Sequence, residues 1–152
     1  PNNECTCTPQ MIQKYMSRIS GPLLDRIDLH VEVPAVPYTD LTEKPKGERS
    51  DKVRLRVEKT RNVQLKRFKS DENKYCNAHM GTRDIQTYCR IDKSGSQLLK
   101  TAMEKLGLSA RAYDRILKVS RTIADLEGEA NILPQHLSEA IQYRSLDRQL
   151  WL

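Results

Sequence analysis

The chain has 152 residues, room for one ordinary domain or a small domain with an appendage. Hydrophobic residues make up 38% with a single Phe and a single Trp, so that a core must use Leu, Ile, Val, Ala and Met. The net charge is +6, no stretch approaches the roughly 18 apolar residues of a membrane span, and no signal peptide opens the chain, which predicts a cytoplasmic protein without membrane contact.

The first third predicts two short elements. Residues 9–18 favour a helix, since apolar side chains recur at helical spacing, and Gly21-Pro22 is expected to break it. Residues 27–33, Ile-Asp-Leu-His-Val-Glu-Val, alternate apolar and polar side chains and predict a half-buried strand that Pro34 closes. No other segment has a convincing strand pattern, so we expect the partners of this strand to lie outside these residues, in a larger fold.

Residues 34–50, rich in Pro and charge, predict a linker, and everything beyond them predicts helix. The first helix, over 51–69, carries eight basic residues from position 52 onward against Glu58. The expected boundary signals that follow are an N-cap at Ser50, one at Thr82, a capping box at Ser94-x-x-Gln97, a stop at Gly107, an N-cap at Ser109, a stop at Gly128 and a first-turn Pro134. The predicted fold is mainly α: a bundle of about five helices over 50–148, preceded by a short helix and one orphan strand.

Cysteine and histidine patterns give weak signals. Cys5-x-Cys7 with Cys76-x-x-His79 would supply four ligands of the kind that zinc prefers, but the paired C-x-x-C knuckles of a strong zinc signature are missing. We therefore predict ordinary reduced thiols, including Cys89, and no metal site. Three histidines, His30, His79 and His136, are expected to be structural.

The most distinctive segment for chemistry surrounds Arg26. The 152 residues contain no G-x-x-x-x-G-K-[ST] loop, so they cannot bind ATP in the P-loop manner by themselves. A tight turn at Gly21-Pro22 followed by Arg26 before a strand would place a permanently charged guanidinium at the rim of a sheet, within reach of a phosphate on a neighbouring subunit. The spacing alone favours a simpler reading, in which Arg26 pairs locally with Asp25 or Asp28.

Several segments resemble a known family. Leu23-Leu24-Asp25-Arg26-Ile27 resembles the arginine-finger segment of the helix-2-insert branch of AAA+ ATPases, which includes the magnesium chelatase ATPase subunit and the minichromosome maintenance helicases, with Ile in place of the usual Phe. Residues 108–126 resemble the lid helix of bacterial magnesium chelatase-like, competence-type ATPases, and residues 136–144 resemble their terminal helix. The resemblance runs from about Cys5 to Arg148, and Cys5-x-Cys7 resembles the second half of a cysteine-rich segment of that family.

The resemblance implies a domain plan and three site residues. Residues 1–35 would be the end of a nucleotide-binding core, poorly ordered in isolation, 36–49 a linker and 50–152 the helical lid. Arg26 would act in trans as arginine finger in a hexameric ring. Arg111, in the first turn of the lid helix, would be the sensor-2 arginine that contacts the γ-phosphate. Arg115, one turn later, would support it or pair with Asp114 or Glu127.

The implied activity is that of a longer protein with a P-loop. ATP and Mg²⁺ are its expected ligands, neighbouring subunits its expected partners, and DNA remodelling or branch migration in natural transformation its expected task. The basic helix would contribute DNA contacts, or would be a solvated face; the residues in question are Arg54, Arg61, Lys66 and Arg67. Two alternatives stay open: metal insertion into a porphyrin, as in the chelatase subunit itself, and a stand-alone helical nucleic-acid-binding module. The last predicts an independent start and no orphan strand.

Overall fold

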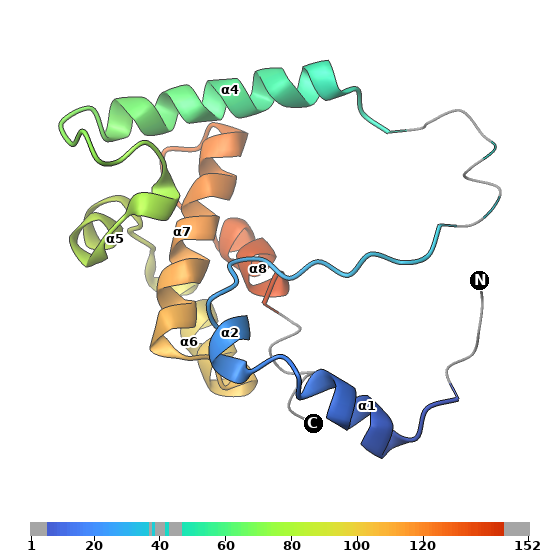
Figure 1. The fold of residues 1–152 in the computed structure, drawn as a ribbon. Coiled ribbons are helices and arrows are strands. Elements are labelled where there is room, and N and C mark those ends of the chain that lie inside the picture. The colour runs from blue at the N-terminus through green and yellow to red at the C-terminus, as the bar shows by residue number, and fades with distance from the viewer. Residues whose placement is uncertain (1–5, 37, 39–41, 43–46, 145–152) are drawn as a thin grey trace.

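The computed structural model describes residues 6–36, 38, 42 and 47–144, and within these ranges the secondary structure is helical (Figure 1). The predicted mainly α fold is confirmed, and the described residues contain no β-strand. In chain order the helices are α1 (Pro9–Met16), α2 (Gly21–Leu24), α4 (Ser50–Arg67), the short 3₁₀ helix η1 (Asn77–His79), α5 (Thr82–Tyr88), α6 (Lys93–Leu106), α7 (Ala110–Glu127) and α8 (Pro134–Gln142). None of the helices in these ranges is both long and apolar enough to cross a membrane.

Helix α7 is the centre of the bundle. It packs against α8, α4, α5 and η1, and α8 also packs against α6 (Figure 1). One face of α7 is buried because apolar side chains recur at helical spacing, among them Ala112, Ile116, Ile123 and Ala124. The core cluster adds residues from each neighbouring element, including Phe68, Met80, Ile85, Leu99 and Leu137.

Several predicted helix boundaries are confirmed. Ser109 caps α7, and its hydroxyl accepts a hydrogen bond from the amide of Ala112 at 3.1 Å. Gly107 and Gly128 end α6 and α7 in the left-handed conformation, with φ of 61° and 80°, which costs a residue without a Cβ little. Pro134 occupies the first position of α8.

Three other predicted caps are wrong by one or two positions. Helix α6 begins at Lys93 rather than after Ser94, because Asp92 is the N-cap and its carboxylate accepts from the amide of Gly95 at 2.7 Å. A carboxylate outcompetes a hydroxyl there because it is a charged acceptor at the positive end of the helix dipole. Ser50 and Thr82 are the first residues of their helices, preceded by the N-caps Arg49 and Gly81.

Only the second half of α4 is packed into the bundle. Thr60, Gln64 and Phe68 are buried, whereas Leu55 keeps 67% of its surface exposed and Val57 keeps 44%. The helix therefore extends past the bundle at its amino-terminal end, as Figure 1 shows.

The predicted strand over 27–33 does not form. Residues 29–36 have no regular secondary structure, although the amide of His30 donates to the carbonyl of Tyr143 at 2.9 Å. The physical reason is that a strand needs a neighbouring strand to complete its hydrogen bonds, and none lies in the part of the chain that the structure describes. The helix predicted over 9–18 forms as α1 and ends at Met16, before Gly21-Pro22, and these two residues then open the short helix α2, in which Leu24 is buried. Of the predicted 34–50 linker, residues 37, 39–41 and 43–46 lie outside the described residues.

Candidate functional site

Arg26 follows α2 and is exposed to solvent. Its Nη1 donates a hydrogen bond to the carbonyl of Pro22 at 3.1 Å, which fixes the guanidinium against the α2 turn. The local pairing with Asp25 or Asp28 that the spacing favoured is wrong, since both carboxylates bind arginines of α7 instead. The turn therefore presents Arg26 outward while its acidic neighbours hold the turn on the bundle.

Asp25 contacts the amino-terminal end of α7 through two residues, the N-cap Ser109 and Arg111. Arg111 Nη1 lies 3.3 Å from Asp25 Oδ2, and the Ser109 hydroxyl donates to Asp25 Oδ1 at 2.7 Å. The Arg111 side chain keeps 52% of its surface exposed. A carboxylate is stabilised at this position because the amino-terminal end of a helix carries partial positive charge. Arg111 is thus already engaged by an anion that the chain itself supplies.

Arg115, one turn further along α7, forms an ion pair with Asp28. The predicted partners Asp114 and Glu127 are wrong, because the segment after α2 brings Asp28 to Arg115 instead. The side chain of Arg115 is 22% exposed and that of Asp28 is 57% exposed. The Nε of Arg115 is buried and has no hydrogen-bond partner among the residues that the structure describes.

A third arginine, Arg144, anchors the same segment from the end of α8. Its side chain is only 1% exposed, and Nη1 donates to the backbone carbonyl of Ile27. Its Nη2 lies 3.9 Å from Asp25 Oδ1. Sequence reasoning missed Arg144 and both carboxylates as partners, because no spacing rule connects residues so far apart. The only local signal was the pair of acidic residues on either side of Arg26-Ile27.

A groove of about 650 Å³ runs along this face of α7. Cationic and anionic side chains share its lining with apolar ones, and those that bear on function are Asp28, Arg111, Arg115, Lys118, Glu139 and Tyr143. The Tyr143 hydroxyl donates to Glu139 at 3.2 Å, and the negative charge of that carboxylate raises the pKa of Tyr143. The three cations lie along one helix face and can each offer charge-assisted hydrogen bonds to an anion, although three carboxylates, Asp28, Asp114 and Glu139, line the same groove.

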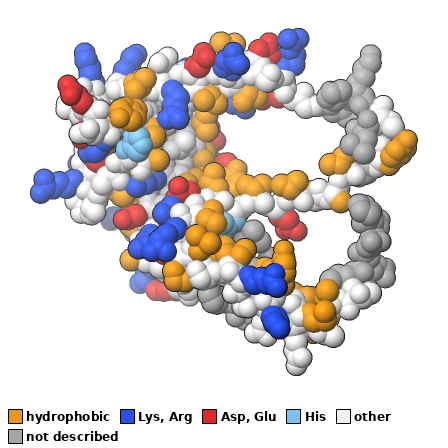
Figure 2. Space-filling view, viewed as in Figure 1, with side chains coloured by type: hydrophobic (Ala, Val, Ile, Leu, Met, Phe, Trp, Pro, Cys, Tyr) orange, Lys and Arg blue, Asp and Glu red, His pale blue; other side chains and the backbone are white. Residues whose placement is uncertain are grey.

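The basic helix α4 carries the residues predicted to contact DNA. Arg54, Arg61 and Lys66 are exposed, and Figure 2 shows Lys and Arg side chains with a few acids along α4 at the top of the view. Arg67 is different: its Nη2 lies 2.5 Å from Asp125 Oδ1 and its side chain is only 13% exposed. The assignment of Arg67 to a nucleic-acid surface is therefore corrected, because this guanidinium points into the bundle.

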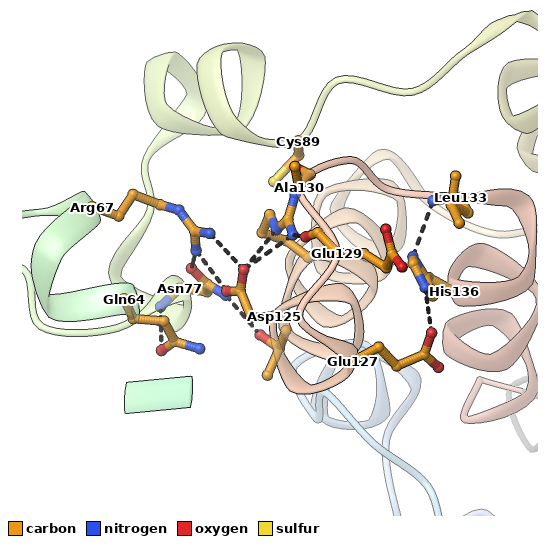
Figure 3. A network of polar contacts seen from close by, with 12 residues as sticks. Gln64, Arg67, Asn77, Cys89, Asp125, Glu127, Glu129, Ala130, Leu133 and His136 are labelled. Atoms are coloured by element: carbon orange, nitrogen blue, oxygen red, sulfur yellow. Dashed lines mark hydrogen bonds and ion pairs between the residues drawn. The ribbon is translucent and has the colours of Figure 1, made fainter. Parts of the chain in front are cut away.

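Arg67 belongs to a buried polar network between α4, η1 and α7 (Figure 3). Asp125 Oδ1 also accepts a hydrogen bond from Arg121 Nε at 3.1 Å, and the side-chain amide of Asn77 donates to Asp125 Oδ2 at 2.8 Å. Arg121 further donates to the carbonyls of Glu129 and Ala130 at 2.6 and 2.8 Å. Burial by itself raises the pKa of the Asp125 carboxyl, but hydrogen bonds from Arg67 and Asn77 outweigh burial and hold the pKa below its usual value.

The histidine at the start of α8 has a structural role, as predicted for His136. Its ring is fully buried, Nδ1 accepts from the amide of Leu133 at 3.0 Å, and Nε2 faces Glu127 Oε2 at 2.9 Å (Figure 3). The hydrogen bond from His136 is the main cause that lowers the pKa of Glu127. Both ring nitrogens are thereby used within the fold.

The cysteines give no ligand cluster in the described ranges. Cys5 lies outside them, so the four-ligand set that includes it is not tested. Cys7 is exposed, Cys76 is half-buried, and burial raises the pKa of the Cys89 thiol to about 11. Over the residues that the structure describes, no three His, Cys, Asp or Glu side chains are arranged to hold a metal ion.

Comparison with known proteins matches nearly the whole chain. Residues 47–144 match the family model described as magnesium chelatase, subunit ChlI C-terminal, and residues 1–41 match magnesium chelatase, subunit ChlI. The chain is 45% identical over 144 residues to competence protein ComM of Haemophilus influenzae, which covers 94% of the chain and 27% of that protein. It is 42% identical over 149 residues to the uncharacterized protein YifB of Salmonella typhimurium, covering 97% of the chain and 28% of YifB. The chain thus spans little more than a quarter of these relatives.

Proposed function

The chain belongs to the magnesium chelatase-like family, and on that premise we propose that it is the arginine-finger and lid portion of a ring-forming AAA+ ATPase that remodels DNA. The observation that carries the proposal is the exposed Arg26 guanidinium, steadied by the Pro22 carbonyl and directly preceded by the carboxylate that engages Arg111. Arg26, the proposed finger, and Arg111, the proposed lid arginine, thus lie on neighbouring parts of one chain, the turn after α2 and the first turn of α7.

Arg26 would act on ATP that the next subunit holds. Charge develops on the transferred phosphoryl group during hydrolysis, and a planar, permanently charged fork stabilises it without any proton transfer. Its exposure suits this role, because a finger that serves another subunit must project from its own. This role requires a neighbouring subunit, as the proposed ring would supply.

Arg111 would contact the γ-phosphate of ATP bound by its own subunit. It lies in the first turn of α7, where the helix dipole adds positive potential, and half of its side chain is accessible. Arg115 would support it from the next turn, where its ion pair with Asp28 keeps the guanidinium in the same groove. The residues present therefore suit a phosphate, while P-loop and magnesium ligands would come from other segments, because the 152 residues contain no P-loop.

Bound Mg²⁺ would neutralise charge on the β- and γ-phosphates and orient them for displacement. This chain would contribute the two arginines and a movable lid that reports whether nucleotide is present.

DNA is the favoured substrate because of the basic face of α4. Arg54, Arg61 and Lys66 project from a helix that stands partly clear of the bundle, and phosphate contacts need only accessible cations. A relative at 45% identity bears the name competence protein, which agrees with a task on DNA. Membership of a family described as magnesium chelatase supports the alternative of metal insertion into a porphyrin.

The test of the finger uses a full-length protein that contains this chain. We expect Arg26→Ala to reduce ATP turnover by on the order of 10³–10⁵-fold and to leave ATP binding intact, since the residue acts in the transition state on a neighbour. Arg18→Ala, an exposed arginine over the Tyr15 ring, is the matched control and should leave turnover unchanged. Loss of nucleotide binding in Arg26→Ala would instead assign Arg26 to the structure.

The test of the substrate is stimulation of turnover by DNA. Charge reversal at Arg54 and Lys66 should weaken DNA binding and lower the salt dependence of the binding constant, because fewer counter-ions are released. Lys100→Glu on α6, whose side chain is 68% exposed, is the control. Turnover that responds to a porphyrin and ignores DNA would favour the chelatase alternative.

A further inference from the structure

The two carboxylates that flank Arg26-Ile27 hold two arginines of α7. Asp25 contacts Arg111 at 3.3 Å and Asp28 pairs with Arg115. Each carboxylate forms an ion pair with a guanidinium that lines the groove along α7. A phosphate that entered this groove would need the same guanidinium nitrogens, so carboxylate and phosphate compete for them.

The contacts of this segment differ in how readily they can be exchanged. Arg144 is buried and holds the Ile27 carbonyl, a backbone group that no ligand replaces. Arg111 is half exposed, and an ion pair at such a site contributes little net free energy because water screens it. The pair between Asp25 and Arg111 can therefore open while Arg144 keeps the segment in place.

We propose that Asp25 is an internal counter-ion that competes with a polyphosphate for Arg111, so that a polyphosphate on Arg111 releases one restraint on the turn that carries Arg26. The inference rests on the proposed role of Arg111 as a phosphate contact. Asp25 directly precedes Arg26, and the amide of Arg26 is bonded within the same turn, to the carbonyl of Leu23 at 3.0 Å.

The consequence is a link between two nucleotide sites of the ring. Arg111 would sense ATP of its own subunit and Arg26 would serve ATP of the neighbour. Asp25 contacts the Arg111 guanidinium and directly precedes Arg26 in the chain. Nucleotide on one subunit would thereby change the freedom of the finger that serves the next.

The experiment measures binding of inorganic tripolyphosphate to the 152-residue chain by calorimetry at low ionic strength. Asp25→Asn removes the competing charge but keeps an oxygen that can accept from Ser109. We expect it to bind tripolyphosphate roughly two- to fivefold more tightly than the unaltered chain, the range that corresponds to the loss of one exposed ion pair. Asp25→Asn combined with Arg111→Ala should lose this gain.

Asp51→Asn is the matched control. It makes the same chemical change in an exposed pair, with Arg49 at 3.2 Å, at the start of α4. An equal gain in Asp51→Asn, no gain in Asp25→Asn, or a gain that survives Arg111→Ala would each overturn the proposal. Circular dichroism checks that the variants remain helical.

A second measurement needs no substitution. Saturating tripolyphosphate should accelerate hydrogen exchange at the Arg26 amide of the unaltered chain, and unchanged protection there would refute the release of the turn. Neither measurement requires ATP hydrolysis. If Arg26→Ala in the full-length protein keeps its turnover, the proposed function fails while the counter-ion result stands. If Arg26→Ala loses turnover but Asp25→Asn gains no affinity for tripolyphosphate, the counter-ion proposal fails while the proposed function stands.

Discussion

Helix α7 carries arginine–aspartate clusters at both ends, and their surroundings are opposite. In its last turns, Arg67 and Arg121 converge on Asp125, whose side chain is 1% exposed. In its first turns, Arg111 pairs with Asp25, and these side chains are 52% and 27% exposed. Arginine and aspartate thus form a buried network at the carboxy-terminal end of α7 and a solvent-exposed ion pair at its amino-terminal end.

The difference teaches that burial decides what an ion pair does. A buried carboxylate with two guanidiniums around it cannot exchange partners, because an uncompensated charge in the interior is costly. An exposed ion pair contributes little net free energy, so an anion with better hydrogen-bond geometry can replace its carboxylate. The first cluster therefore fixes η1 and α4 on α7, and the second can take part in ligand exchange.

The largest expected effect comes from breaking the buried cluster. Asp125→Asn should lower the free energy of unfolding by about 3–5 kcal/mol, because two guanidiniums would stay buried without their charge partner. Urea denaturation of the 152-residue chain followed by circular dichroism measures this. A loss below about 1 kcal/mol would show that the network behaves like a surface pair.

The sequence predicted those parts of the fold that depend on local chemistry. Gly107 and Gly128 as helix ends and Ser109 as a cap were correct because each acts through its own turn of backbone. The cap of α6 was placed at Ser94 because hydroxyl and carboxylate caps lie two residues apart and both fit the pattern. The strand over 27–33 was predicted from the alternation of apolar and polar side chains. That pattern indicates a segment able to join a sheet, but it does not show whether a partner strand is present.

The polar sites were predicted less well because they join distant segments. Arg67 looked like one more member of a basic run, but it meets Asp125 across 58 positions of sequence, and composition carries no signal of that contact. Asp25 and Arg111 are 86 positions apart. The roles of Arg26 and Arg111 came from the resemblance to a family and stay predictions, whereas their positions on the turn and on the first turn of α7 are now described.

Acid should weaken the buried cluster by a smaller amount. The pKa of Asp125 is depressed in the folded chain, so its contribution to stability is present above the unfolded pKa, about 3.9, and is lost as pH falls through the lower folded pKa. We expect unfolding free energy to drop below about pH 4 in the unaltered chain. In Asp125→Asn this part of the pH dependence should be missing. An unchanged acid slope in that variant would contradict the assignment.

The smallest effect should come from the exposed end of α7. Asp28→Asn should lower the free energy of unfolding by about 0.2–1 kcal/mol, because the Asp28 side chain is 57% exposed and water screens the pair. The difference from the unaltered chain should vanish in about 1 M NaCl, where the screening length falls to about 3 Å. The loss of unfolding free energy caused by Asp125→Asn should persist in about 1 M NaCl, because dissolved ions screen a buried ion pair much less. If both differences respond equally to salt in parallel denaturation series, burial does not separate the two clusters, and exchange at Arg111 loses its physical basis.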